Sequence, residues 1–242
     1  MDKHSLVNTR TFPFAWPWAD VNNNRIPLMS AIVKRKFSYL YLLTVWGIIV
    51  TLGYGENSKC SETWKTVLQC EYSFWVRNLT ENPLIFLRNV FTTSLVHNNW
   101  DHILFVTIAG VFIVIQSYEV RFGAKETAFM FLFGYFLVAG LFGIFYTWGL
   151  AMWPDSEFFL ISFSRNWTGG SLGLMFLFGG LVYVSKRPLL LISLPFIFES
   201  WNYFINGIKP HITMMHLVSV LFGLAAKATL EHYRSRSKQL EK

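Results

Sequence analysis

The chain has 242 residues, of which 53% are hydrophobic, 18% aromatic and only 14% charged. So small a charged fraction excludes an ordinary water-soluble globular domain, in which about a quarter of the residues carry charge. The formal net charge is +7, and the placement of the basic residues decides whether nucleic acid or a membrane explains it.

Six stretches nearly free of charged side chains follow one another along the chain. They are residues 37–55, 102–118, 127–154, 166–185, 188–208 and 210–226. Because about 20 apolar residues in a helix cross the hydrocarbon core of a bilayer, these stretches predict six transmembrane helices. We therefore expect an all-α, polytopic membrane protein, with an N-terminal segment 1–36, a membrane domain 37–230 and a basic tail 231–242.

The basic residues are concentrated on one side of the predicted helices. If the N-terminus is cytoplasmic, 15 of the 21 Lys and Arg residues fall in segments that face the cytoplasm. This asymmetry follows the positive-inside rule and predicts that both termini are cytoplasmic. Topology therefore explains the net charge, and we expect the lipid bilayer as a partner and no nucleic acid.

The first outer loop contains both cysteines, Cys60 and Cys70. A disulfide between them is expected if that face is oxidising, and the sequence is equally compatible with two unlinked thiols. Asn78 and Asn166 begin Asn-x-Thr sequons on the same side, which matter only if the host glycosylates.

Several polar side chains lie where a membrane makes them costly, near the outer ends of three predicted helices. His97 and His102 belong to the second helix, Ser171 to the fourth and His216 to the sixth. All reach a similar shallow depth, roughly two helical turns below the outer surface, and polar groups inside a span are functional candidates. Imidazole is the usual base that removes the proton of a nucleophilic serine. These residues therefore form a candidate site of nucleophile, base and oxyanion donor.

Small residues on these helices would let their backbones approach closely. They are Gly169, Gly170, Gly173, Gly179 and Gly180 on the fourth stretch, and Ser219 and Gly223 after His216 on the sixth. Structural explanations also exist, since Ser171 could bond its own backbone and His216 could hold two helices together. Metal binding by His97 and His102 is disfavoured, because no carboxylate or thiolate joins them at ligand spacing. We expect neither a metal nor a cofactor.

Four segments in order resemble the rhomboid family of intramembrane serine proteases. They are "FTTSLVHNNWDHILF", preceded by Arg88, then "YEVRFG", "WTGGSLGLMFLFGG" and "HLVSVLFG". The resemblance covers about residues 75–226 and implies a six-helix fold that hydrolyses peptide bonds in transmembrane substrates. Its implied site residues are the nucleophile Ser171, the general base His216, the oxyanion donor His102, the accompanying His97, and the supporting Gly169 and Gly170.

Two positions depart from the family pattern. Val106 stands where the family usually has an asparagine four residues after His102, which removes one oxyanion donor. Leu172 replaces the glycine that usually follows the serine, and a shift of one residue in register, a rotation of ~100° on a helix, would put Leu172 in the serine's place. We favour Ser171 because Gly169 precedes it by two residues. The alternative is a catalytically inactive rhomboid-like protein that binds or escorts membrane clients.

Two charged features take no part in this predicted site. Glu119 and Arg121 are expected to hold a cytoplasmic turn together by hydrogen bonds. Glu199 is the one charged residue within the fifth stretch, and the sequence predicts no role for it.

Overall fold

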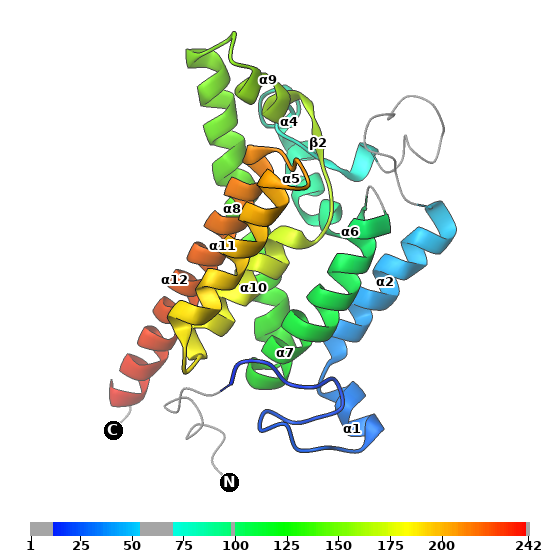
Figure 1. Ribbon diagram of the computed structural model, residues 1–242, viewed down its shortest axis with the longest axis vertical. Helices are drawn as coiled ribbons and strands as arrows, with labels where there is room; N and C mark the ends of the chain where they lie inside the picture. The colour runs from blue at the N-terminus through cyan, green and yellow to red at the C-terminus, as the bar shows by residue number, and fades with distance from the viewer. Residues whose placement is uncertain (1–11, 54–69, 98–99, 241–242) are drawn as a thin grey trace.

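The computed structural model describes residues 12–53, 70–97 and 100–240. In this part of the chain nearly all regular structure is helical, as predicted (Figure 1). The first half contains α1 (Leu28–Val33), α2 (Lys36–Leu52), β1 (Phe74–Trp75), α4 (Asn78–Glu81), α5 (Pro83–Thr92), η2 (Thr93–Leu95), α6 (Trp100–Leu104), η3 (Phe105–Ile115) and α7 (Gln116–Phe122). The second half contains α8 (Ala124–Met152), α9 (Glu157–Ser164), β2 (Asn166–Trp167), α10 (Ser171–Val184), α11 (Pro188–Phe204) and α12 (Pro210–Leu240).

Three helices of the described chain are long and apolar enough to cross a membrane. They are the continuous helix Trp100–Phe122, α8, and Pro210–Ser237 within α12. The middle of the first is η3, which is wound as a π-helix. Two further apolar helices, Lys36–Thr51 and Ser171–Val184, are shorter, and α11 has 17 residues. The predicted stretches thus become helices, three of which have the length and composition of a span.

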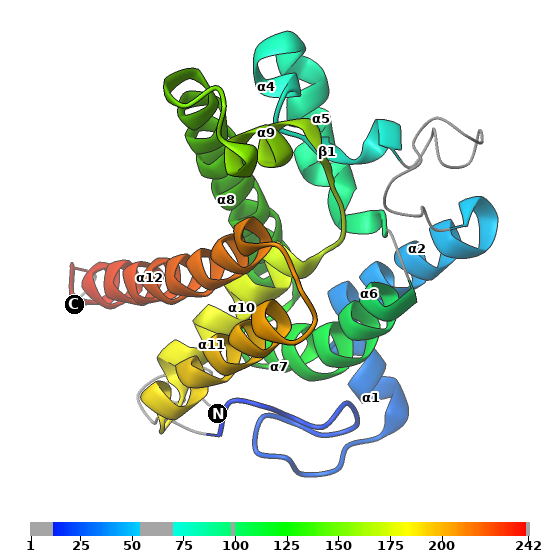
Figure 2. The ribbon, with the colours of Figure 1, turned by 45° about the horizontal axis from the view of Figure 1, so that its top comes forward.

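The fourth apolar stretch becomes the central helix of the molecule. In Figures 1 and 2, α10 lies between α8, α12 and the helix that ends in α7. It is apolar all round, and nearly every side chain from Ser171 to Val182 is buried, as expected of a helix enclosed by others. At 14 residues it is only ~21 Å long. The predicted helix over 166–185 therefore begins five residues later than expected, because residues 166–167 form the strand β2 and residues 168–170 form a turn with Gly169 at φ +92°.

Backbone contact between α10 and α12 depends on two glycines. A Cβ on Gly179 would overlap the carbonyl oxygen of Val220, and a Cβ on Gly223 would overlap that of Phe176. The hydroxyl of Ser219 adds a hydrogen bond of 2.7 Å to the carbonyl oxygen of Leu172. The prediction that small residues permit close approach is confirmed for this pair of helices.

Hydrogen bonds hold together the end of the molecule where α7 is followed by α8, as predicted for the turn that carries Glu119 and Arg121. The Glu119 carboxylate accepts hydrogen bonds of 2.8 Å from the backbone N–H groups of Phe37 and Ser38, and so caps α2. Arg121 donates to the carbonyl of Pro13 at 3.0 Å. This bond holds segment 12–27 against α7, and the C-terminal end of α12 lies at the same end of the molecule (Figure 1).

Candidate active site

Three neighbouring helices bring a hydroxyl, an imidazole and a carboxylate into one chain of contacts. Ser171 Oγ on α10 lies 2.9 Å from Nε2 of His216 on α12. The other ring nitrogen of His216, Nδ1, lies 2.7 Å from Oε1 of Glu199 on α11. Only 1% of the Glu199 side chain and 14% of the His216 side chain are exposed, so this chain of contacts lies inside the protein.

The peptide before Ser171 is held on both sides. The Gly169 N–H donates to the carbonyl oxygen of Thr93 at 2.9 Å, and the Gly169 carbonyl accepts from the Tyr135 hydroxyl at 2.8 Å. The Thr93 hydroxyl donates to the carbonyl of Trp167 at 2.5 Å and accepts from the N–H of Phe74 at 3.2 Å. These bonds fix the point at which extended chain turns into α10.

The two glycines that directly precede Ser171 each meet a steric demand. Gly169 has φ +92°, a conformation that other residues adopt at a cost, and a Cβ there would overlap Cε1 of His102. A Cβ on Gly170 would overlap the hydroxyl of Tyr41. The His102 ring can therefore lie against the Gly169 backbone, beside the start of α10.

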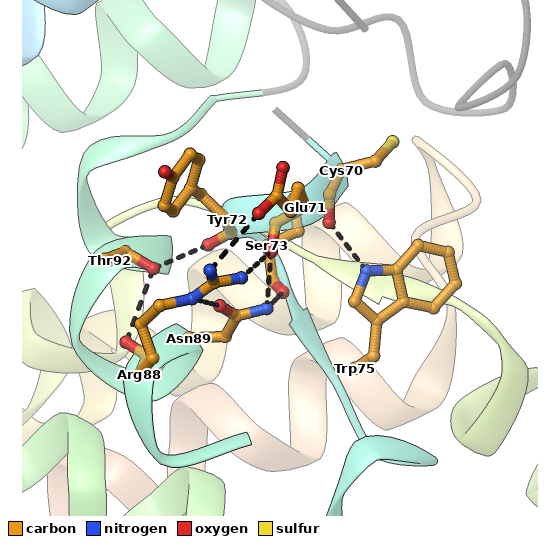
Figure 3. A network of polar contacts seen from close by, with 8 residues as sticks. All are labelled: Cys70, Glu71, Tyr72, Ser73, Trp75, Arg88, Asn89 and Thr92. Atoms are coloured by element: carbon orange, nitrogen blue, oxygen red, sulfur yellow. Dashed lines mark hydrogen bonds and ion pairs between the residues drawn. The ribbon is translucent and has the colours of Figure 1, made fainter. Parts of the chain in front are cut away.

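A polar network outside the site supports this turn (Figure 3). Nδ2 of Asn89 donates to the carbonyls of Glu71 and Ser73 at 2.7 and 2.6 Å, and Arg88 reaches the Glu71 carbonyl at 2.9 Å. These bonds attach segment 70–75 to α5. Its strand β1 pairs with β2, the strand that leads into Ser171, with Phe74 opposite Trp167.

His97 and His102 lie together next to the site, with 3.3 Å between their Nδ1 atoms. Burial, and then the neighbouring His102, hold the pKa of His97 well below its ordinary value, so His97 is neutral at neutral pH. One Nδ1 must therefore donate to the other. If His97 is the donor, the proton of a neutral His102 is on Nε2. Val106 is buried in the apolar core, and its side chain has no hydrogen-bond donor.

A cavity of about 730 Å³ opens onto Ser171, His216 and Glu199. Its wall includes His102, Trp167 and Leu172 in addition to Arg165. The Arg165 guanidinium donates to Nε2 of His211 at 2.8 Å and lies 5.1 Å from the centre of the Trp167 ring. In the described chain no group of three or more His, Cys, Asp or Glu side chains is placed to hold a metal ion.

The structure brings together every residue that the sequence singled out for the site. Ser171, and not Leu172, is the residue bonded to His216. Glu199 is the site residue for which the sequence predicted no role. Its signal was a charge in the middle of an otherwise apolar helix, where an ionisable group is costly unless it has a partner or a function.

The structure also bears on the predictions for the cysteines and for the two Asn-x-Thr sequons. Cys70 is disulfide-bonded, and Cys60 lies outside the described residues. Asn166 of the second sequon is only 9% exposed within β2, which disfavours glycan attachment there. Asn78 of the first sequon begins α4 and is partly buried.

Comparisons of the chain with protein-family models, with curated proteins and with solved structures find no match. The described fold and site define an all-α protein with three helices long and apolar enough to cross a membrane and a contact of Ser171, His216 and Glu199 inside it.

Proposed function

We propose that the protein is an intramembrane serine protease of the rhomboid type, which cleaves transmembrane substrates with Ser171 as nucleophile and His216 as general base. The observation that carries the proposal is the 2.9 Å distance between Ser171 Oγ and His216 Nε2. A serine hydroxyl is a weak nucleophile until a positioned base accepts its proton, and this distance lies within the range for such a transfer.

The reaction then proceeds by acyl transfer. Ser171 Oγ attacks the carbonyl carbon of the substrate peptide while its proton moves to Nε2 of His216. The C–N bond breaks, the imidazolium returns the proton to the leaving amine, and an acyl-enzyme remains. Water attacks this ester, again giving its proton to Nε2, and the released acid and Ser171 hydroxyl complete the cycle.

Two groups are placed to stabilise the oxyanion of the tetrahedral intermediate. The Ser171 N–H lies in the first turn of α10, where N–H groups have no intrahelical acceptor. His102 lines the same cavity and serves as the second donor in the tautomer that carries its proton on Nε2. With Val106 at the position of the family's asparagine, these two groups are the donors that remain, and the loss of one oxyanion donor costs ~10²- to 10³-fold in rate.

The proposed membrane arrangement has six spans, with both termini in the cytoplasm and the site near the outer face. The three long apolar helices support it, as does the position of α10 and α11 beside them. His216 precedes Lys227 by 11 residues on α12, so the site lies ~16 Å along the helix from Lys227, the first of the basic residues in the C-terminal part of α12. The substrate is a transmembrane helix that unwinds locally, because a helix whose backbone is fully hydrogen-bonded presents no peptide for attack.

A serine-directed fluorophosphonate tests the nucleophile on the purified full-length protein. We expect covalent labelling of the wild type, with loss of labelling in Ser171→Ala and in His216→Ala. Ser164→Ala is the matched control, because Ser164 is an exposed serine whose hydroxyl bonds to its own helix. Cleavage of a reporter transmembrane peptide in liposomes should follow the same order.

Labelling that persists in Ser171→Ala would place the nucleophile elsewhere and contradict the proposal. A folded wild type that neither labels nor cleaves would favour the binding protein that escorts membrane clients. The core position of Val106 is the observation that favours this second function.

A further inference from the structure

We propose that Glu199 is the third member of a Ser171–His216–Glu199 triad, a positioning residue that sets the tautomer of His216 and compensates its charge during the reaction. This inference rests on the proposed function and deepens it, because the sequence pattern assigns catalysis to Ser171 and His216 alone. It depends on the 2.7 Å contact between Glu199 Oε1 and His216 Nδ1.

The helical hairpin of α11 and α12 brings the two side chains to the same depth. Glu199 lies five residues before the end of α11 at Phe204, and His216 lies six residues after the start of α12 at Pro210. The connection is short and is closed by hydrogen bonds of 3.1 Å from the N–H groups of Asn206 and Ile208 to the Asn202 carbonyl. At 1.5 Å per residue, both side chains are therefore ~8 to 9 Å from the turn.

The carboxylate determines which ring nitrogen of His216 carries the proton. An ionised carboxylate only accepts hydrogen bonds, so Nδ1 must be the protonated nitrogen of the neutral ring. The lone pair of Nε2 is then directed at the Ser171 hydroxyl, which becomes the donor. This is the tautomer in which His216 acts as a base, and the opposite tautomer would donate to Ser171 and block proton transfer.

The surroundings of Glu199 favour a function in the reaction over one in stability alone. Its side chain is 1% exposed, Oε2 has no hydrogen-bond partner, and no Lys or Arg of the described chain forms an ion pair with it. A buried carboxylate without a cation is costly. When His216 accepts the serine proton, the imidazolium becomes that cation. The interaction is therefore stronger in the transition state than in the resting enzyme, which is the condition for catalysis.

The test compares fluorophosphonate labelling rates of full-length Glu199→Gln, Glu199→Asp and wild type over a range of pH. Glutamine keeps the size of the side chain but can donate to Nδ1, so we expect labelling to fall by about 10⁴-fold, the loss known for amide replacement in a triad. Aspartate keeps the carboxylate and should label at least about tenfold faster than glutamine. The acidic limb of the rate should move to lower pH in Glu199→Gln, because the imidazolium loses its counter-charge, and stay in place in Glu199→Asp.

Glu126→Gln is the matched control. The Glu126 side chain, on α8, is also nearly buried and bonds at 2.6 Å to Lys227, 11 residues beyond His216 on α12, so its loss tests general destabilisation without touching the site. The tautomer of His216 can also be measured directly, without a Glu199 variant. In wild-type protein with ¹⁵N-labelled histidine, the His216 signals, assigned by their absence in His216→Ala, should show a protonated Nδ1 at neutral pH.

Failures of the two proposals are distinguishable. Wild-type labelling that Ser171→Ala abolishes and Glu199→Gln leaves at the wild-type rate, with an unmoved pH profile, overturns the triad and keeps the protease. A wild-type signal for His216 protonated on Nε2 also overturns the triad. Labelling that does not depend on Ser171 removes the proposed function, and with it the triad.

Discussion

At the scale of single residues, Gly169 has the most constrained position in the site. It combines φ +92° with contact to the His102 ring, so an added methyl group would strain the backbone and collide with the imidazole. Gly169→Ala should lower the free energy of unfolding by ~1 to 3 kcal/mol. It should also reduce fluorophosphonate labelling more than tenfold, since it displaces either His102 or Ser171.

Thermal unfolding in detergent and the labelling rate, measured on the same sample, check this prediction. Gly140→Ala is the control, because a Cβ at this helical position has nothing within 4 Å. Gly140→Ala should keep wild-type stability and labelling. A Gly169→Ala protein with both properties of the wild type would show that the ring does not depend on this glycine.

At the scale of elements, the site depends on how closely α10 approaches α12, because Ser171 and His216 lie on different helices. Gly223→Ala would drive a methyl group into the Phe176 carbonyl of α10, and backbone cannot move aside as a flexible side chain can. We expect a loss of ~1 to 3 kcal/mol in stability, as is usual for overpacking. Separation of the helices should also lengthen the 2.9 Å contact of Ser171 and His216 and slow labelling.

The matched control for Gly223→Ala is Gly47→Ala on α2, where a Cβ meets nothing within 4 Å. The unfolding midpoints and labelling rates of Gly223→Ala and Gly47→Ala are then compared. If the two alanine variants were equally stable and equally reactive, close approach of α10 and α12 would not be what positions Ser171 and His216.

The same two helices show how far the sequence predicts the structure and where it fails. Charge-free runs locate the helices, because the cost of burying charge acts on each segment separately. Whether Ser171 or Leu172 faces His216 depends on ~100° of rotation, which neighbouring helices determine. The start of α10 at Ser171 depends on Thr93, a residue far away in sequence. The partner of Glu199 likewise appears only when the hairpin of α11 and α12 has formed.

At the scale of the whole molecule, the proposed orientation makes a prediction about which ends are reached from outside. The connection between α8 and α9, which contains Ser156, lies at the end of the molecule near β2, and the last part of α12, which contains Ser235, lies at the end near segment 12–27. With the basic end in the cytoplasm, a membrane-impermeant maleimide added to intact cells should label Ser156→Cys and not Ser235→Cys. Both variants should label once the membrane is permeabilised.

The wild-type chain, which contains the natural cysteines, is the control for labelling at those positions, and Cys70 among them is disulfide-bonded. Labelling of Ser235→Cys alone in intact cells would reverse the orientation, and water would then reach Ser171 from the cytoplasm.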